Sequence, residues 1–277
     1  MKLSSEINIE KYLNRIDFHN TIVIDENSLF GLQKQHLLNI PFENLDIHYG
    51  KNISLSIKDI YKKIIIQKRG GFCYELNGIF HQLLKQLGFS AKLISARVHK
   101  DKGKYSPEYD HLAIIVKLGS KEFLVDVGFG QFSLEPLLLN ANQIIKDDYG
   151  LFQFDKYDTD YYRINEIKNN ELIPQYIFKI KEREFNEFDK RCKFHQTSNN
   201  SHFTKKKLIS IATANGRITL NNSQLKITRA EIENIKKFEE SEFENILKQY
   251  FEIEIDNVKY GDNIPESTKH NNVAQKK

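Results

Sequence analysis

Cys73 has the surroundings that best suit a nucleophile in this sequence. It lies in residues 69–77, RGGFCYELN, directly after a pair of glycines and a phenylalanine. Apolar residues then recur at helical spacing as far as Leu87, and Gly88 follows as a helix stop. The pattern predicts Cys73 in the first turn of a long helix, where free N–H groups and the helix dipole stabilise a thiolate and lower the thiol pKa. The alternative is a buried cysteine that packs as a small apolar residue.

A cysteine nucleophile needs a base and a group that orients the base, and His111 and Asp126 suit these roles. His111 begins one predicted strand and Asp126 nearly ends the next. If the turn is centred between Leu118 and Gly119, the two residues lie directly opposite, with Cβ atoms ~5 Å apart on one face. Asp126 then fixes the tautomer of His111 and leaves the other ring nitrogen for a nucleophile. A slip of one residue puts the two side chains on opposite faces.

Two other carboxylates compete with Asp126 for this role. Asp110 is adjacent to His111 along the strand, so its side chain is expected on the other face, and Glu122 lies nearer the turn. Asp126 lies in an apolar run that leads into Gly-Phe-Gly at residues 128–130. Because a carboxylate in an apolar run usually has a specific partner, we favour Asp126. A solvated Asp126 at a strand end remains the alternative.

The apolar periodicity changes twice along the chain. Residues 1–89 have mostly helical spacing, whereas residues 90–205 contain short runs with strand-like alternation, which predict an antiparallel sheet or small barrel. After residue 205, Asn215 and Gly216 predict a β-hairpin. Capping signatures that begin at Thr228 and Ser241 predict two helices, and residues 251–255 predict a last strand. The residues from about Gly261 onward are polar, which predicts a disordered tail.

Composition excludes several classes of protein. The 277 residues contain no run near the ~20 apolar residues of a membrane span, and the first residues lack the apolar segment of a secretory leader. The net charge of +4 suits a phosphorylated ligand but is far below that of a nucleic-acid-binding protein. We therefore expect a cytoplasmic protein without a nucleic-acid or membrane partner. The sequence carries no signal for an oligomeric state.

The second cysteine does not change this interpretation. A disulfide between Cys73 and Cys192 is possible, but two cysteines without a leader suit a reducing compartment better. His195 and His202 follow Cys192, which raises the question of a metal site. Their spacing does not match a zinc pattern, so no metal is expected.

With these residues in place, the chain resembles the arylamine N-acetyltransferases. The signature of that family, Arg-Gly-Gly-x-Cys-x-Glu-x-Asn, matches residues 69–77. The family then has a histidine at a strand start and an aspartate before Gly-Phe-Gly, which His111 and Asp126 match. Weaker matches occur at residues 40–45, 136–137 and 216–220, and the resemblance extends from about residue 8 to 256.

The resemblance implies an α+β fold with a papain-like Cys-His-Asp triad. It implies an N-terminal helical bundle over residues 1–89 that carries the nucleophile, and an antiparallel β-barrel over residues 90–205 that carries the histidine and the aspartate. A C-terminal α/β lid over residues 206–277, ending in the polar tail, completes the expected fold. The same resemblance makes Glu43 and Arg69 a supporting ion pair.

The resemblance also implies a ping-pong reaction with acetyl-CoA as co-substrate. Cys73 becomes acetylated, and an arylamine or arylhydrazine then takes the acetyl group. His111 accepts the proton from Cys73, Asp126 orients His111, and the backbone N–H of Cys73 is a candidate oxyanion donor.

Further residues are implied to line the binding sites. Phe42, Val98 and Phe129 would form the acceptor pocket, although ordinary core packing is the alternative for each. The residues implied to contact CoA are Gly130, Thr197, Ser201 and Phe203. The chain departs from the family here, because Ser198 and Asn199 replace the usual histidine and proline.

Two other functions use the same residues. A thiol hydrolase or transglutaminase-like enzyme also uses Cys, His and Asp in this order, but such enzymes often carry a Trp beside the nucleophile and this chain has none. A non-catalytic protein that binds CoA or an aromatic amine in the same cleft is the second alternative.

Overall fold

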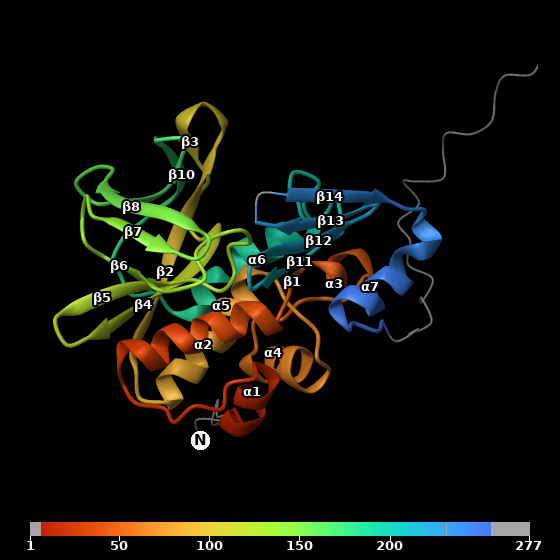
Figure 1. Ribbon diagram of the computed structural model, residues 1–277, viewed down its shortest axis with the longest axis horizontal. Helices are drawn as coiled ribbons and strands as arrows, with labels where there is room; N and C mark the ends of the chain where they lie inside the picture. The colour runs from red at the N-terminus through yellow and green to blue at the C-terminus, as the bar shows by residue number, and fades with distance from the viewer. Residues whose placement is uncertain (1–6, 231, 256–277) are drawn as a thin grey trace, which may run out of the picture.

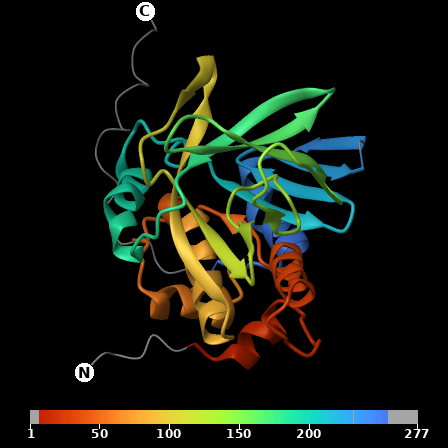
Figure 2. The same cartoon turned by 90° about the vertical axis from the view of Figure 1, so that its left-hand side faces the viewer.

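Helices support two antiparallel sheets in the computed structural model, which describes residues 7–230 and 232–255. Figure 1 shows the helices of the first part of the chain beneath both sheets, which lie on either side of the centre of the molecule. Figure 2, with the larger sheet toward the viewer, shows α6 at the side of that sheet. The fold is α+β, as expected.

The helices of the first part of the chain begin and end at recognisable signals. Asn8 caps α1 by accepting a hydrogen bond from the Lys11 N–H (2.8 Å), and Asp25 caps α2 by accepting from the Ser28 N–H (2.8 Å). The segments are α1 Ile9–Arg15, α2 Glu26–Asn39, α3 Leu45–His48, α4 Ile57–Tyr61, a π-helical turn Lys62–Ile66 and α5 Cys73–Gln86. The prediction that Cys73 begins a long helix is confirmed. No helix in the described ranges is both long and apolar enough to cross a bilayer.

The larger sheet curls into a nearly closed barrel with the strand order β6-β5-β4-β2-β10-β9-β8-β7, and β3 pairs with β2. Its strands are β2 Ser90–Lys100, β3 Lys104–Tyr105, β4 His111–Leu118, β5 Lys121–Val125, β6 Leu137–Leu138, β7 Ile144–Asp147, β8 Gly150–Lys156, β9 Tyr162–Lys168 and β10 Glu171–Phe178. Alternate residues of β4 are buried on its two sides. Leu112 and Ile114 pack in the core that contains the helices, whereas Ala113 and Ile115 pack inside the barrel. Strand β4 thus contributes side chains to both hydrophobic cores.

The second sheet, which we call the C-terminal sheet, has the order β1-β11-β12-β13-β14. Its strands are β1 Phe42–Glu43, β11 Leu208–Thr213, β12 Gly216–Asn221, β13 Gln224–Arg229 and β14 Ile232–Lys237. One face buries Ile209, Leu220 and Leu225 against α7 (Phe243–Phe251). The hairpin predicted at Asn215 and Gly216 is confirmed, since Thr213 pairs with Gly216. The short β1 joins this sheet to the helical part of the chain.

The remaining helical segments follow the barrel and the C-terminal sheet. They are a 3-10 turn Phe185–Phe188, α6 Asp189–Thr197, and a 3-10 turn Glu240–Glu242 before α7. The helix predicted after Ser241 is therefore present as α7, although no side chain caps its start.

Two predictions for this region are wrong. The capping signature at Thr228 does not open a helix, because Thr228 pairs with Glu233 across the β13–β14 hairpin. A short local pattern is weak against the pairing of a whole strand. Residues 251–255 do not form a strand either: Phe251 ends α7, and Glu252 turns the chain in a left-handed conformation with φ 55°. The tail predicted to be disordered lies outside the described residues.

Candidate active site

The loop before Cys73 is held against β1. The backbone of Gly71 forms a parallel bridge with Phe42, and the Glu43 N–H donates to the Gly71 carbonyl (2.8 Å). A Cβ atom on Gly70 would lie 2.1 Å from the Pro41 carbonyl oxygen, so only glycine permits this approach. The two glycines of the motif thus bring β1 to the start of α5.

A buried cluster of five charged residues supports this loop from beneath. Arg69 pairs with Glu43 (2.7 Å) and Asp46 (2.9 Å), and Lys63 pairs with Asp46 (2.8 Å) and Glu75 (2.9 Å). The predicted ion pair of Glu43 and Arg69 is therefore confirmed, as one part of a larger network.

Glu75 connects the charged cluster to the helix start. Its carboxylate accepts a hydrogen bond from the Phe72 N–H (3.1 Å), which satisfies one backbone donor before α5. Complete burial, opposed by Lys63 and reinforced by Glu43, raises the pKa of Glu75 to about 7. With three carboxylates against two cations, Glu75 is the member whose charge changes near neutral pH.

His111 and Asp126 meet, but in a different register from the predicted one. His111 Nε2 lies 2.6 Å from Asp126 Oδ2, and both residues are 2% exposed. The β4–β5 turn occupies residues 119–120, since Leu118 pairs with Lys121. This register places Asp126 one pair beyond Val125, diagonal to His111 and on the same face. The predicted strand register was wrong by two residues, and a shift of two residues leaves both side chains on the same face of the sheet.

Asp126 has a partner on every side. Its Oδ1 accepts hydrogen bonds from Asn77 Nδ2 (2.9 Å) and the Gly128 N–H (2.9 Å), and its Oδ2 accepts one from the Tyr176 hydroxyl (3.0 Å) as well as contacting His111. Burial and the carboxylate of Asp126 raise the pKa of the Tyr176 phenol, so Tyr176 remains a donor. These contacts leave Asp126 with one orientation.

Asn77 ties the helix of Cys73 to the strands of His111 and Asp126. Its amide nitrogen donates to the Leu112 carbonyl (2.7 Å) as well as to Asp126, and its oxygen accepts from the Val127 N–H (2.9 Å). The last residue of the sequence motif therefore fixes the distance between α5 and the β4–β5 hairpin.

Gly128 allows the loop after Asp126 to lie directly on Cys73. A Cβ atom built on Gly128 would lie 2.8 Å from Cys73 Cα and 2.8 Å from Asn77 Nδ2. At this distance a Cβ atom would overlap the backbone of Cys73, and the backbone could not move aside without disturbing α5. This explains the glycine at this position of the Gly-Phe-Gly segment.

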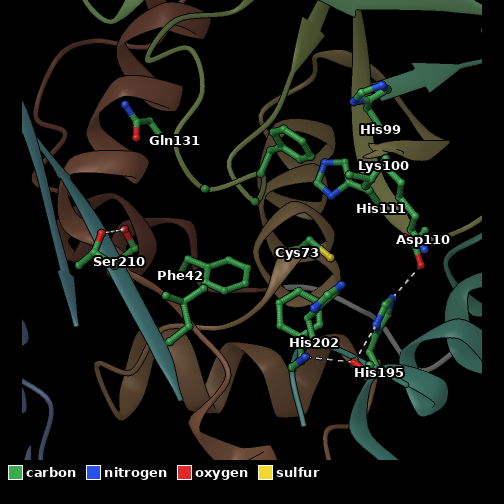
Figure 3. Close-up of a pocket in the computed structure, with 18 of the residues that line it drawn as sticks. Phe42, Cys73, His99, Lys100, Asp110, His111, Gln131, His195, His202 and Ser210 are labelled. Carbon is green, nitrogen blue, oxygen red and sulfur yellow. Dashed lines mark hydrogen bonds and ion pairs between the residues drawn. The ribbon is translucent and has the colours of Figure 1, made fainter. Parts of the chain in front are cut away.

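The ionisation of Cys73 differs from the prediction. Burial and the carboxylates of Asp126 and Asp110 raise the pKa of the Cys73 thiol, opposed by a backbone hydrogen bond from Leu112. The position at the start of α5 is as predicted, but it does not by itself lower the thiol pKa. A thiolate here therefore needs a cation nearby, and His111 lines the same cavity as Cys73 (Figure 3).

A cavity of about 710 Å³ opens above Cys73 and His111. Of the residues expected to contact the two substrates, those that line it are Phe42, Val98, Phe129, Gly130, Ser201 and Phe203. The structure does not bring Thr197 to this cavity. Thr197 is exposed at the end of α6, and its hydroxyl donates to the Lys193 carbonyl (2.9 Å).

The competing residues have other partners. Asp110 pairs with Arg191 and with His195 Nε2 (3.0 Å), and Glu122 pairs with Lys92 (3.3 Å). His195 also contacts the Ser201 hydroxyl through Nδ1 (3.2 Å), so neither of its nitrogens is left for a metal.

Both cysteines are free in the structure. Cys192 Sγ accepts a hydrogen bond from Gln196 (3.2 Å), and burial raises the pKa of its thiol to about 12. Cys192 therefore remains protonated and unreactive near neutral pH.

Sequence reasoning missed two groups that shape this site. Tyr176 comes from β10, 50 residues after Asp126, and no spacing pattern connects the two. The sequence indicates Asn77 only as part of the motif. The available signal is an amide side chain on a helix whose apolar spacing predicts burial. A buried amide needs specific hydrogen-bond partners.

Comparison with known proteins gives one consistent result. A sequence model of an N-acetyltransferase family matches residues 26–260. Arylamine N-acetyltransferase 2 of Mus musculus is 29% identical over 276 residues, which cover 90% of this chain and 95% of that protein.

Solved structures agree with this result. Arylamine N-acetyltransferase C from Bacillus anthracis superposes with a TM-score of 0.81 at 25% identity, over 92% of this chain and 100% of that one. The arylamine N-acetyltransferase from Salmonella typhimurium has the same fold, with a TM-score of 0.85 at 23% identity over 91% of this chain and 93% of that one.

Replacement of Gly128 tests the close approach to Cys73. We expect Gly128→Ala to lower the free energy of unfolding by about 1–3 kcal/mol, because the new methyl group overlaps the Cys73 backbone. Urea denaturation measures the change. Gly150→Ala is the matched control, since its nearest neighbour would be 3.8 Å away, and we expect little change there. Equal stability of Gly128→Ala and wild type would contradict the described packing.

The pKa of Glu75 predicts how stability changes with pH. Because that pKa is raised from 4.5 to about 7 on folding, its stabilising contribution is complete below pH ~4.5 and is lost as pH rises through 7. Glu75→Gln stays neutral, so wild type should lose on the order of 3 kcal/mol relative to this variant between pH 4.5 and 8. Urea unfolding at several pH values measures the difference. The exposed Glu10→Gln is the control, and a difference independent of pH would reject the assignment.

Proposed function

The chain belongs to the arylamine N-acetyltransferase family, a family of transferases, and on this premise we propose that it moves an acetyl group from acetyl-CoA to an arylamine or arylhydrazine through acetyl-Cys73. The observation that carries the proposal is the buried pair of His111 and Asp126, 2.6 Å apart, of which His111 lines the same cavity as Cys73 at the start of α5. A nucleophile, a base and an orienting carboxylate are the minimum set for acyl transfer through a covalent intermediate.

In the first half of the reaction, His111 takes the proton of Cys73 as the sulfur attacks the thioester carbonyl. The high thiol pKa makes this transfer necessary, because few thiolates form without a cation beside the sulfur. N–H groups at the start of α5 stabilise the oxyanion that develops. The bond from the carbonyl carbon to the CoA sulfur then breaks, and His111 returns its proton to the leaving thiolate.

In the second half, the amine nitrogen attacks the acetyl carbon on Cys73. The C–N bond forms as His111 accepts the proton of the amine. The bond to the Cys73 sulfur then breaks, and His111 passes the proton to that sulfur, which restores the thiol. Asp126 stabilises the imidazolium in both halves and prevents rotation of the ring, since Asn77, Gly128 and Tyr176 fix the carboxylate.

The cavity supplies suitable surroundings for a flat aromatic acceptor. Phe129 stands edge-on to His111, with ring centroids 5.0 Å apart, and Phe42 and Val98 provide further apolar surface. For acetyl-CoA, the lining residues Gly130, Ser201 and Phe203 remain in the proposed contact set, and the exposed Lys100 at the cavity is suited to a phosphate. Thr197 is left out of this set.

Incubation with acetyl-CoA alone tests the proposed function. Wild type should gain one acetyl group on Cys73, detected by mass spectrometry of the intact protein and its peptides, and an added arylamine should remove it. Cys73→Ala should gain none, with Cys192→Ala as the control that still becomes acetylated. Release of an acyl group from an amide without an adduct from acetyl-CoA would support a thiol hydrolase instead. Binding of CoA or amine without turnover would leave a binding protein.

A further inference from the structure

Strand β14 forms the free edge of the C-terminal sheet, and Figure 1 shows it at the upper margin of that sheet. One side of β14 pairs with β13, and no strand within residues 7–230 and 232–255 covers the other side. All six of its residues are exposed. Ile232 and Ile235 are 68% and 57% exposed, more than any other large apolar side chain in the described ranges. An open edge with exposed apolar side chains is a template for pairing with another strand.

The pairing with β13 decides which backbone groups of β14 stay free. The Phe238 N–H, directly after β14, donates to the carbonyl of Ser223, directly before β13 (3.1 Å). Because backbone groups alternate in direction along a strand, the even-numbered residues of β14 hydrogen-bond to β13. The N–H and C=O groups of Glu233, Ile235 and Lys237 therefore point away from the sheet. They are available to an antiparallel strand.

The same three residues share one face of the sheet. Ile235 pairs with Lys226, which lines the cavity, so the side chains of Glu233 and Lys237 also lie on this face. The free edge thus presents an acidic, an apolar and a basic side chain at every second position. Glu233 pairs with Lys226 (2.8 Å), but its side chain stays 50% exposed and accessible to a second cation.

We propose that two copies of this chain pair through β14 as antiparallel strands, around a two-fold axis at Ile235, and so join their C-terminal sheets into one. The order acid, apolar, base is complementary to itself when one strand is reversed. Ile235 then lies opposite the partner's Ile235, and Glu233 lies opposite the partner's Lys237. The axis repeats this ion pair on the other side of the two isoleucines. Opposite charges and apolar side chains placed directly across two strands stabilise their pairing.

Other registers fit this edge less well. The outward backbone groups of both strands must face each other, so the strands slip by two residues at a time, which moves the axis by one residue. An axis at Asn234 places Glu233 opposite the partner's Ile235 and removes the ion pairs. An axis at Lys236 places two like charges directly opposite each other, which is unfavourable. The axis at Ile235 is therefore the register in which the charges are complementary.

Lysines on an edge strand often prevent pairing, but neither lysine of β14 does so in this register. Lys237 meets a carboxylate, and Lys236, on the other face, lies opposite the partner's Asn234. The contact is small, because one pair of six-residue strands buries less than the ~1,600 Å² of a standard interface. We therefore expect a weak dimer, with a Kd on the order of 10 μM.

Sedimentation equilibrium of the full chain, from micromolar to submillimolar concentration, tests the proposal. Wild type should show a monomer–dimer equilibrium. Ile235→Lys places two like charges across the axis and should weaken association at least roughly 10-fold, with unchanged circular dichroism because Ile235 is exposed. A monomer at every concentration would overturn the proposal, whatever else covers this edge. So would a wild-type dimer constant in Ile235→Lys.

Charge reversal tests the register. Glu233→Lys and Lys237→Glu each put like charges into both ion pairs, so each variant alone should associate on the order of 10- to 50-fold more weakly. An equimolar mixture of the two should form a heterodimer with about the wild-type affinity, because every pair then joins opposite charges again. A mixture that associates no better than its components would contradict the proposed pairing.

Lys236→Glu is the matched control. It makes the same change of charge as Lys237→Glu on the same strand, but on the face where it lies opposite the partner's Asn234. The dimer constant should stay close to that of wild type, and a loss equal to that of Lys237→Glu would reject the proposal. None of these residues lines the cavity, so acetylation of Cys73 should be the same in all four variants. The dimer and the proposed function are therefore tested separately.

Discussion

The carboxylate of Asp126 is the point at which the separate parts of the fold are joined. It contacts Asn77 of α5, His111 of β4, Tyr176 of β10 and the backbone of Gly128, and it is almost completely buried. A buried charge that loses its partners costs roughly 3–5 kcal/mol, so each of these elements must keep its place for the charge to be tolerated. The same contacts hold the imidazole of His111 in one orientation. Stability and the proposed chemistry therefore depend on one constraint.

The start of α5 has a complementary role. The cluster of Arg69, Lys63 and three carboxylates fixes the loop before Cys73, and Gly128 lies directly on the backbone of Cys73 from the other side. This close packing buries the thiol and raises its pKa, which is unfavourable for a nucleophile. In the proposed reaction the compensating cation is His111, since Arg69 and Lys63 are occupied by carboxylates. The proposal thus makes the reactivity of the sulfur dependent on the histidine.

Local patterns predicted the parts of this site that lie within one helix or one hairpin. The helix at Cys73 follows from apolar spacing. The contact between His111 and Asp126 was predicted correctly although the strand register was wrong, because a shift of two residues leaves both side chains on the same face of the sheet. The helix expected after Thr228 was wrong because pairing with a neighbouring strand decided its conformation. The contact of Tyr176 with Asp126 could not be predicted, since it joins segments far apart in sequence. The division of the chain into domains at residues 89 and 205 stays a prediction.

The central claim is that His111, held by Asp126, provides the base that makes Cys73 reactive. The rate of Cys73 alkylation by iodoacetamide, followed against pH in wild type and in Asp126→Asn, tests it most directly. Cys192 does not interfere, because burial raises its thiol pKa to about 12. We predict that wild type is alkylated faster than Asp126→Asn near neutral pH, because the base held by Asp126 takes the thiol proton. Asp126→Asn, with unchanged folding by circular dichroism, should react only toward the alkaline pH that the raised thiol pKa requires. Identical profiles for the two proteins would contradict this claim.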